Sequence, residues 1–218
     1  MLTDAQRYDQ QYSGYMKLMS MRPQSVGFAL ADSPVGLAAW IYALLQDVDI
    51  GATLLRERGP HALTLEALTD AAGRTRGSFY YHFRDRDVFL AALVARWRHE
   101  TLDARAAFLP PPNAPSDLRA FLRGEPFRLD HSFERALRQL AAVEPTVRFA
   151  VDEVDRARID ALSVLVAALR PELDDPASHA FVQYAAMVGG QWLIMDDNDP
   201  RLDGIKASAF RLFGLDED

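Results

Sequence analysis

The chain has 218 residues, of which 49% are hydrophobic and 25% charged, and its formal net charge is −7. This composition is typical of a globular protein and excludes a wholly disordered chain. The absence of cysteine excludes a disulfide scaffold, a zinc finger with cysteine ligands and thiol catalysis. Since no stretch of about 18 uncharged apolar residues and no secretory signal pattern is present, we expect a cytoplasmic protein that does not bind membranes.

Charge is distributed unevenly along the chain. Residues 53–98 contain eight arginines and five acidic residues, whereas residues 131–218 contain nine basic and sixteen acidic residues. A locally basic segment on an acidic body is the pattern expected of a protein in which one module faces a polyanion.

Residues 1–43 differ in composition from the rest of the chain. They are rich in Tyr, Met, Gln, Ser and Gly and show no long helical period. Pro34, which follows Ser33, can start a helix that leads to Leu44. We predict that residues 1–43 form a partly disordered arm, and that its helix either docks on the rest or continues into the next helix.

Helical periodicity broken by Gly and Pro continues from residue 44 onwards. The hydroxyls of Thr64 and Thr75 can cap two short helices, and Gly73 can end the first of them. No segment predicts a convincing strand, so the fold class is all-α. The predicted helices span residues 44–58, 65–72, 76–82, 85 or 87 to 108, 116–123, 131–143, 146–169, 177–195 and 203–213.

Two short capped helices joined by a tight turn are typical of a helix-turn-helix, whose second helix lies in the major groove of DNA. Phe79 and Phe83, four residues apart, can pack inward from the second helix. The other side chains of residues 76–82 then face outward, and they include groups that can reach phosphates and base edges. We therefore predict a three-helix DNA-binding domain over residues 44–90, followed by a helical ligand-binding and dimerisation domain over residues 91–218.

The stretch Ala-Gly-x-x-x-Gly-Ser-Phe-Tyr-Tyr-His-Phe, which begins at Ala72 and is followed by Leu90, resembles the recognition-helix signature of the TetR family of transcriptional regulators. By this resemblance, Arg76, Ser78 and Tyr81 contact bases and Tyr80 contacts a phosphate. The alternative for Tyr80 or Tyr81 is a place in the core. The residues that the resemblance places at the DNA are Thr64, Arg76, Gly77, Ser78, Tyr80, Tyr81, His82 and Arg86.

The sequence departs from the family pattern in and near the turn. Arg74 stands where an apolar residue, often Val, is usual, and Thr69 stands where Ala is usual. Arg74 either weakens the packing of the turn or adds a phosphate contact. Asp47 and Asp49 also make the first helix acidic. If these departures have degraded the DNA-binding helix, the alternative is a ligand-sensing or scaffold dimer.

The resemblance implies a homodimer that represses transcription at a palindromic operator and responds to a small molecule. The apolar faces of residues 161–169 and 181–193 can form a four-helix interface between two subunits, or fill the core of one subunit. Apolar and aromatic residues of this region predict a pocket for a small apolar or aromatic effector, with ordinary core packing as the alternative. The candidate pocket residues are Trp97, Phe108, Phe121, Phe133, Leu137, Phe149 and Tyr184.

The sequence predicts neither a metal site nor a cofactor. The five histidines are not spaced three or four residues apart, which would place two of them on one helix face. Asp152, Glu153 and Asp155 are predicted to form a solvated helix face rather than an acid–base site.

Residues 9–46 are similar to a piece of a microsomal-type epoxide hydrolase, through the run Asp-Ser-Pro-Val-Gly-Leu-Ala-Ala-Trp-Ile at residues 32–41. Tyr15 matches a lid tyrosine that polarises the epoxide oxygen in that family. The family's chemistry needs an Asp nucleophile on a strand-turn-helix elbow, and too few residues precede Tyr15 to form one. We therefore predict a fusion remnant without catalytic residues, with an enzyme fragment as the remaining alternative.

Overall fold

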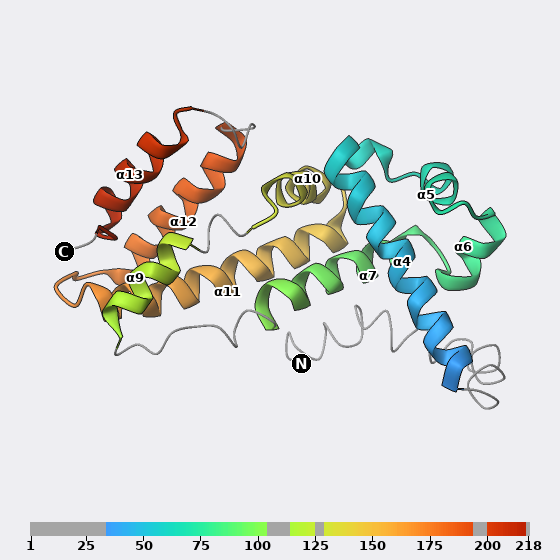
Figure 1. The fold of residues 1–218 in the computed structure, drawn as a ribbon, viewed down its shortest axis with the longest axis horizontal. Helices are drawn as coiled ribbons and strands as arrows, with labels where there is room; N and C mark the ends of the chain where they lie inside the picture. The colour runs from blue at the N-terminus through green and yellow to red at the C-terminus, as the bar shows by residue number, and fades with distance from the viewer. Residues whose placement is uncertain (1–33, 104–113, 125–128, 194–199, 217–218) are drawn as a thin grey trace. The chain divides into compact units, whose positions relative to one another are not determined.

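The computed structural model describes residues 34–103, 114–124, 129–193 and 200–216, and for residues 34–43 it describes the backbone. These residues are helical and contain no strand, so the predicted all-α class is confirmed for the described part of the chain (Figure 1). Residues 1–33 of the predicted arm and the candidate pocket residue Phe108 lie outside the described residues.

The helices follow the predicted order, and most of their bounds differ from the predicted ones by one or two residues. The fourth predicted helix, which was expected to reach residue 108, ends at Arg98 and is followed by a π-helical segment at His99–Asp103. The chain Pro34–Arg58 is one continuous helix, so the predicted helix at Pro34 runs into the helix predicted over residues 44–58. Pro suits this first position because its fixed φ is helical and its missing N–H has no acceptor there. The elements are α4 (Pro34–Arg58), η1 (Pro60–Ala62), α5 (Leu65–Ala72), α6 (Arg76–His82), α7 (Arg86–Arg98), η2 (His99–Asp103), α9 (Pro115–Gly124), α10 (His131–Ala141), α11 (Pro145–Leu169), α12 (Pro176–Leu193) and α13 (Leu202–Phe213).

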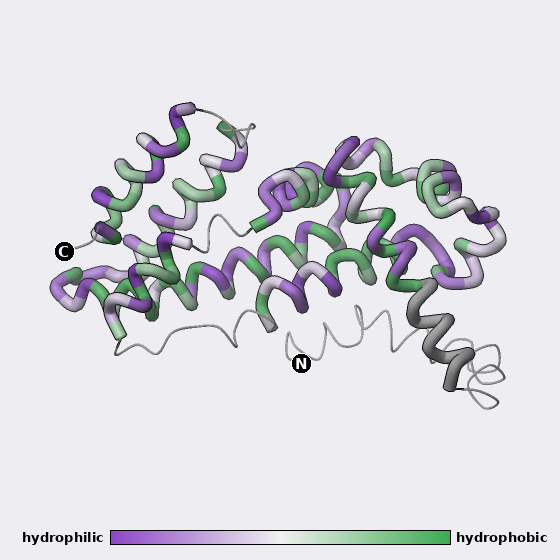
Figure 2. Tube along the Cα trace, in the orientation of Figure 1, coloured by the Kyte–Doolittle hydropathy of each residue, from purple (hydrophilic) through white to green (hydrophobic). Residues whose placement is uncertain are grey.

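The described residues divide into two compact units. The first unit contains the described residues up to Trp97 together with Gln139–Arg148, and the second contains Arg98–Arg138 and the described residues from Phe149 onwards. Figure 2 shows hydrophobic residues recurring along α7 and α11, as expected of helices that bury one face. Within the described ranges, no helix combines the length and the apolar character needed to cross a membrane.

An aromatic core holds the first unit together. The rings of Phe79 and Phe83 lie 5.2 Å apart between their centroids, and Phe83 meets Phe89 of α7 edge to face at the same separation. Phe83, Phe89 and Leu55 of α4 are fully buried. Gly51 lies at the tip of the Phe89 ring, so that a Cβ at this position would collide with the Cζ atom of that ring. The aromatic pair predicted to pack inward therefore fixes α6 on α4 and α7.

The second unit has its own apolar cluster, formed by leucines of α9 and α11 and by the end of α13. Phe121 and Leu162 pack against this cluster from α9 and α11 and are partly buried. The cluster lies wholly within the second unit, so this unit buries a core of its own. Its buried members are Leu118, Leu122, Leu165, Leu169, Phe213 and Leu215.

Candidate nucleic-acid interface

Local hydrogen bonds define the helix-turn-helix. The Thr64 hydroxyl accepts a hydrogen bond from the Ala67 N–H at 3.1 Å, and the Thr75 hydroxyl accepts one from the Ser78 N–H at 3.3 Å. Gly73 ends α5 with φ 62° and ψ 33°, a left-handed conformation that glycine adopts because it has no Cβ. Both predicted caps and the predicted turn are confirmed.

The outer side of α6 presents polar and aromatic side chains. Tyr80 and Tyr81 are 52% and 55% exposed, and Arg76 and Gly77 are exposed as well. Ser78 is half-buried. The alternative that placed one of the tyrosines in the core is therefore wrong for this chain. Arg76, Tyr80 and Tyr81 together offer a charge, two phenolic hydroxyls and two aromatic faces to a ligand outside the unit.

His82 is buried, which corrects the prediction that it faces outward toward DNA. It is 5% exposed, and its Nδ1 lies 2.7 Å from a carboxylate oxygen of Asp47 on α4. The reason is helical geometry, since residue 82 comes three positions after the buried Phe79 and shares its inner face. His82 therefore joins α6 to α4.

Two further predicted contact residues lie at the edges of the interface. Thr64 is exposed, with its hydroxyl engaged as the cap of α5. Arg86, the first residue of α7, is partly exposed, and its Nη1 lies 2.5 Å from a carboxylate oxygen of Glu144. A DNA phosphate that bound Arg86 would therefore compete with Glu144 for the same guanidinium.

The residues that depart from the family pattern have partners inside the unit. The Arg74 Nη1 atom lies 3.1 and 3.2 Å from the two carboxylate oxygens of Asp47, and its Nη2 donates to the Gln46 side chain at 3.2 Å. The buried Thr69 hydroxyl donates to the Leu65 carbonyl at 2.9 Å. Arg74 thus forms an ion pair with α4, which the sequence analysis did not foresee, and Thr69 satisfies its polar group within its own helix.

Residues 48–93 match the family model described as "Bacterial regulatory proteins, tetR family". This range contains the caps, the turn and the exposed face of α6. Residues 48–93 form a TetR-family domain. The family resemblance predicted from the Ala72–Leu90 stretch is therefore confirmed.

Solved structures of TetR-family and related regulators share the fold of this chain. A TetR-family transcriptional regulator from Rhodococcus sp. matches 80% of the chain and 100% of its own length, with 20% identity and a TM-score of 0.63. A transcriptional regulator from Saccharomonospora viridis, solved in complex with choline, matches 79% of the chain and 96% of its own length, with 14% identity and a TM-score of 0.65. Salmonella enterica GusR matches 79% of the chain and 94% of its own length, with 13% identity and a TM-score of 0.61.

A second similarity is to a protein named as an epoxide hydrolase, from Stigmatella aurantiaca (strain DW4/3-1). It is 56% identical to this chain over 45 residues, which make up 21% of the chain. The match spans 10% of the length of that relative. The similarity to an epoxide hydrolase is therefore partial, and the TetR-family match accounts for residues 48–93 independently of it.

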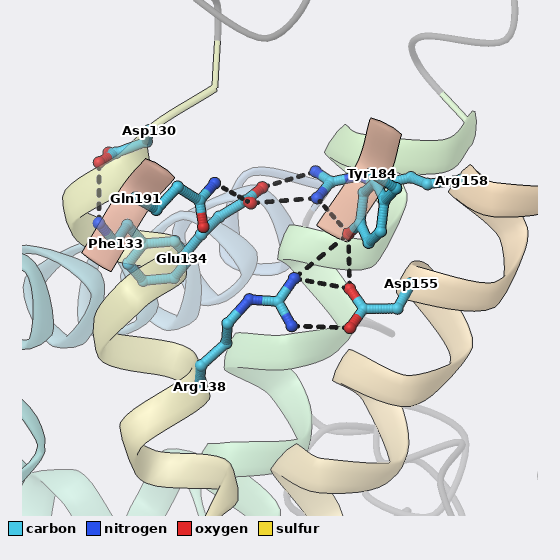
Figure 3. A network of polar contacts seen from close by, with 8 residues as sticks. All are labelled: Asp130, Phe133, Glu134, Arg138, Asp155, Arg158, Tyr184 and Gln191. Carbon is cyan, nitrogen blue, oxygen red and sulfur yellow. Dashed lines mark hydrogen bonds and ion pairs between the residues drawn. The ribbon is translucent and has the colours of Figure 1, made fainter. Parts of the chain in front are cut away.

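The second unit contains a cluster of charged and polar side chains between α10, α11 and α12 (Figure 3). Arg158 donates to both carboxylate oxygens of the buried Glu134, at 3.0 and 2.5 Å. Arg138 donates to both carboxylate oxygens of Asp155, at 2.7 Å each. Gln191 adds a bond from its side-chain amide to Glu134 at 3.2 Å. Two ion pairs thus join α10 to α11, and the Gln191 amide joins α10 to α12. We call Glu134, Arg138, Asp155, Arg158, Tyr184 and Gln191 the polar cluster.

The Tyr184 hydroxyl connects the two ion pairs of the polar cluster. It donates to Asp155 at 2.6 Å and accepts from Arg138 and Arg158 at 3.2 and 3.3 Å. Burial raises the pKa of Tyr184 to about 12. Burial alone would raise the pKa of Glu134, but the hydrogen bonds and charge of Arg158 outweigh it and hold that pKa below its ordinary value of 4.5. Near neutral pH, Glu134 is therefore charged and the Tyr184 phenol is neutral.

The predicted effector-pocket residues have different surroundings. Phe133, Leu137 and Tyr184 are buried in the second unit, and Phe121 packs against its apolar cluster. Trp97 is buried in the first unit. Phe149 is 41% exposed. The Tyr184 hydroxyl contacts Asp155, Arg138 and Arg158, so the surroundings of Tyr184 are more polar than the sequence analysis expected.

Sequence reasoning missed the polar cluster and predicted solvent exposure for acidic residues of α11 that are paired in the structure. Asp155 is half-buried and paired, and Glu153 lies 3.0 Å from the Arg98 Nε, so the predicted solvated face is wrong for these two residues. Asp152 is exposed, as predicted. One available signal was the charge spacing, because Glu134 and Arg138 are four residues apart. In the structure, however, each of these two residues pairs with α11 instead.

Proposed function

We propose that this chain is a DNA-binding transcriptional regulator, and that it acts in the cytoplasm as a homodimeric repressor on a palindromic operator. The observation that carries the proposal is the division of α6 between a buried and an exposed face. Phe79, His82 and Phe83 anchor its inner side, while Arg76 and Tyr80 stay accessible. A helix held in this way can enter a major groove without unfolding its own unit.

An exposed apolar stripe on α12 supports the dimer. Phe181 and Val182 are 59% and 56% exposed, and Trp192 and Leu193 near the end of the same helix are 42% and 81% exposed. Large apolar side chains gathered on one helix favour a covering partner. We propose that a second copy of this chain covers this stripe, because a two-fold pair of helix-turn-helix units reads two half-sites. Of the predicted apolar face on α11, Leu165 is buried in the core of the second unit.

Effector binding in the second unit is the finer part of the proposal. The similar regulator from Saccharomonospora viridis was solved with choline, which supports a small-molecule site in a fold of this kind. The predicted apolar or aromatic effector would meet Phe133 and Leu137, and a polar group on it would displace Arg138 or Arg158 from the Tyr184 hydroxyl. A ligand that prefers one arrangement of α10, α11 and α12 would shift the population of DNA-binding dimers.

Selection of bound duplexes from a random DNA pool tests the function directly. Full-length protein at moderate salt should enrich a palindromic consensus. Recovery of no sequence above background would overturn the proposal and favour the alternative of a ligand-sensing or scaffold dimer. Sedimentation of the same preparation without DNA measures the dimer, and a monomer at micromolar concentration would contradict that part.

Point variants test whether α6 makes the contact. Arg76→Ala and Tyr80→Ala should each weaken operator binding by about tenfold without changing the sedimentation of the dimer. Arg156→Ala removes the same charge from an exposed position on α11 and serves as the matched control. Equal losses in Arg76→Ala and Arg156→Ala would point to general charge effects rather than to a recognition helix.

A ligand screen tests the effector. We expect an aromatic or apolar molecule with a polar group to raise the melting temperature and to release the selected operator. Tyr184→Phe should weaken that response. A ligand that stabilises the protein but leaves operator affinity unchanged would contradict the coupling between the two events.

A further inference from the structure

Asp47 is a buried carboxylate in the middle of the longest helix of the first unit. It is 6% exposed, although an isolated charge in such surroundings is strongly unfavourable. Its oxygens meet two side chains, the Arg74 guanidinium at 3.1 Å and the His82 imidazole at 2.7 Å. One carboxylate on α4 therefore serves two partners that are eight residues apart in the sequence.

The two partners of Asp47 lie at opposite ends of α6. Arg74 immediately precedes Thr75, the residue that caps the N-terminus of α6. His82 is the last residue of α6. The Asp47 carboxylate consequently holds the chain just before the recognition helix and the end of that same helix.

The groups beside Asp47 offer no replacement for its charge. Asp47 and Arg74 line a small hollow. Its other lining residues are Leu68, Thr69, Ala72 and Phe79. The Thr69 hydroxyl already donates to the carbonyls of Leu65 and Glu66. Leu68, Ala72 and Phe79 have apolar side chains. If the carboxylate were neutralised, Arg74 would retain the neutral amide oxygen of Gln46 as its remaining partner on α4.

We propose that Asp47 is a positioning residue for DNA recognition, which sets the orientation of α6 by binding both of its ends to α4. The inference rests on the DNA-binding function proposed above. The residue does not touch DNA in this proposal. It acts through Arg74 and His82, and it explains why an acidic first helix and an arginine in the turn occur together in this chain.

The physical reason is the shortness of α6. A helix of seven residues has two turns and little stability of its own, so its direction depends on its attachments. Contacts to base edges require an accurate direction, whereas contacts to phosphates tolerate small rotations. Loss of the Asp47 charge should therefore reduce sequence-specific binding far more than non-specific binding.

The test compares Asp47→Asn with Asp49→Asn. Asp49 lies on the same helix and pairs with Arg96 of α7, so its variant removes an equivalent charge without touching α6. Affinities are measured for the selected operator and for a random-sequence duplex of equal length. We expect Asp47→Asn to lose about tenfold on the operator and less than about twofold on the random duplex. Asp49→Asn should lose less than about twofold on both.

Salt dependence separates positioning from direct contact. If Arg74 acts only through its ion pair with Asp47, Arg74→Val should lower operator affinity. The slope of log affinity against log salt concentration should then stay unchanged. If Arg74 neutralises a phosphate, the slope should fall by about one unit. The second result would overturn the proposed role of the Arg74–Asp47 pair.

Hydrogen exchange shows whether the variant remains folded. In Asp47→Asn, the amides of residues 79–83 should exchange faster, while those of α11 stay unchanged. A uniform loss of protection, or equal losses on the operator and on the random duplex, would indicate general unfolding and overturn a positioning role. A wild-type chain that retains no duplex would overturn the proposed function itself. If the wild type binds the operator and Asp47→Asn binds it with the same affinity, this inference alone is overturned.

Discussion

Each of the two units buries a carboxylate against arginine, but the surroundings of the two carboxylates differ. Asp47 of the first unit faces Arg74 and His82, with a single acid between the two partners. Glu134 of the second unit belongs to a polar cluster in which two acids face two arginines and a tyrosine joins the pairs. The first arrangement attaches one short helix, whereas the second cross-links three long helices. The same chemistry therefore controls orientation in one unit and stability in the other.

The largest effect should come from Glu134→Ala. The substitution leaves Arg158 without its carboxylate in a largely buried place and removes the partner of the Gln191 amide. Breaking a buried pair from one side costs about 3–5 kcal/mol of the free energy of unfolding. Urea unfolding followed by circular dichroism measures it, with the exposed Asp152→Ala on α11 as the control. A loss below about 1 kcal/mol would show that the cluster contributes little to stability.

A smaller loss of stability is expected for Asp47→Asn. The amide keeps the size of the side chain and can still accept a hydrogen bond from His82, so the loss should be about 1–3 kcal/mol. The same urea experiment measures it beside Glu134→Ala. If Asp47→Asn proves as destabilising as Glu134→Ala, the distinction between an orienting and a stabilising carboxylate fails.

Tyr184→Phe should cost about 1–2 kcal/mol, because it removes one hydroxyl and leaves both ion pairs of the polar cluster in place. Thermal unfolding at constant protein concentration is a suitable measurement. A loss as large as that of Glu134→Ala would mean that the hydroxyl, rather than the ion pairs, holds the three helices together.

The pH dependence gives the smallest and most specific signal. Since the pKa of Glu134 in the folded protein lies below its ordinary value of 4.5, its contribution to stability is complete above that pH. The contribution is lost as the pH falls through the lowered value. The difference in unfolding free energy between wild type and Glu134→Gln should therefore stay constant from pH 7 to about 5 and narrow below that. A difference that stays constant down to about pH 3 would show that the carboxylate is not the group responsible.

Much of the helix-turn-helix in the first unit could be predicted from the sequence. Thr64, Gly73 and Thr75 act on backbone groups at most a few residues away, so their roles follow from local spacing alone. The inward places of Phe79 and Phe83 follow from the helical period in the same way. The family resemblance extended these local signals to the residues expected at the DNA.

Tertiary structure decided which charged side chains found one another. Helical spacing allowed Glu134 to pair with Arg138, yet the packing of α11 beside α10 gives each of them a partner on the other helix. His82 was expected outside and Arg74 had no assigned partner, because the position of Asp47 beside α6 depends on contacts across 27 and 35 residues. Caps and periods act within a few residues and can be read along the chain. A buried ion pair depends on which helices become neighbours, and the assembly of the whole unit determines that.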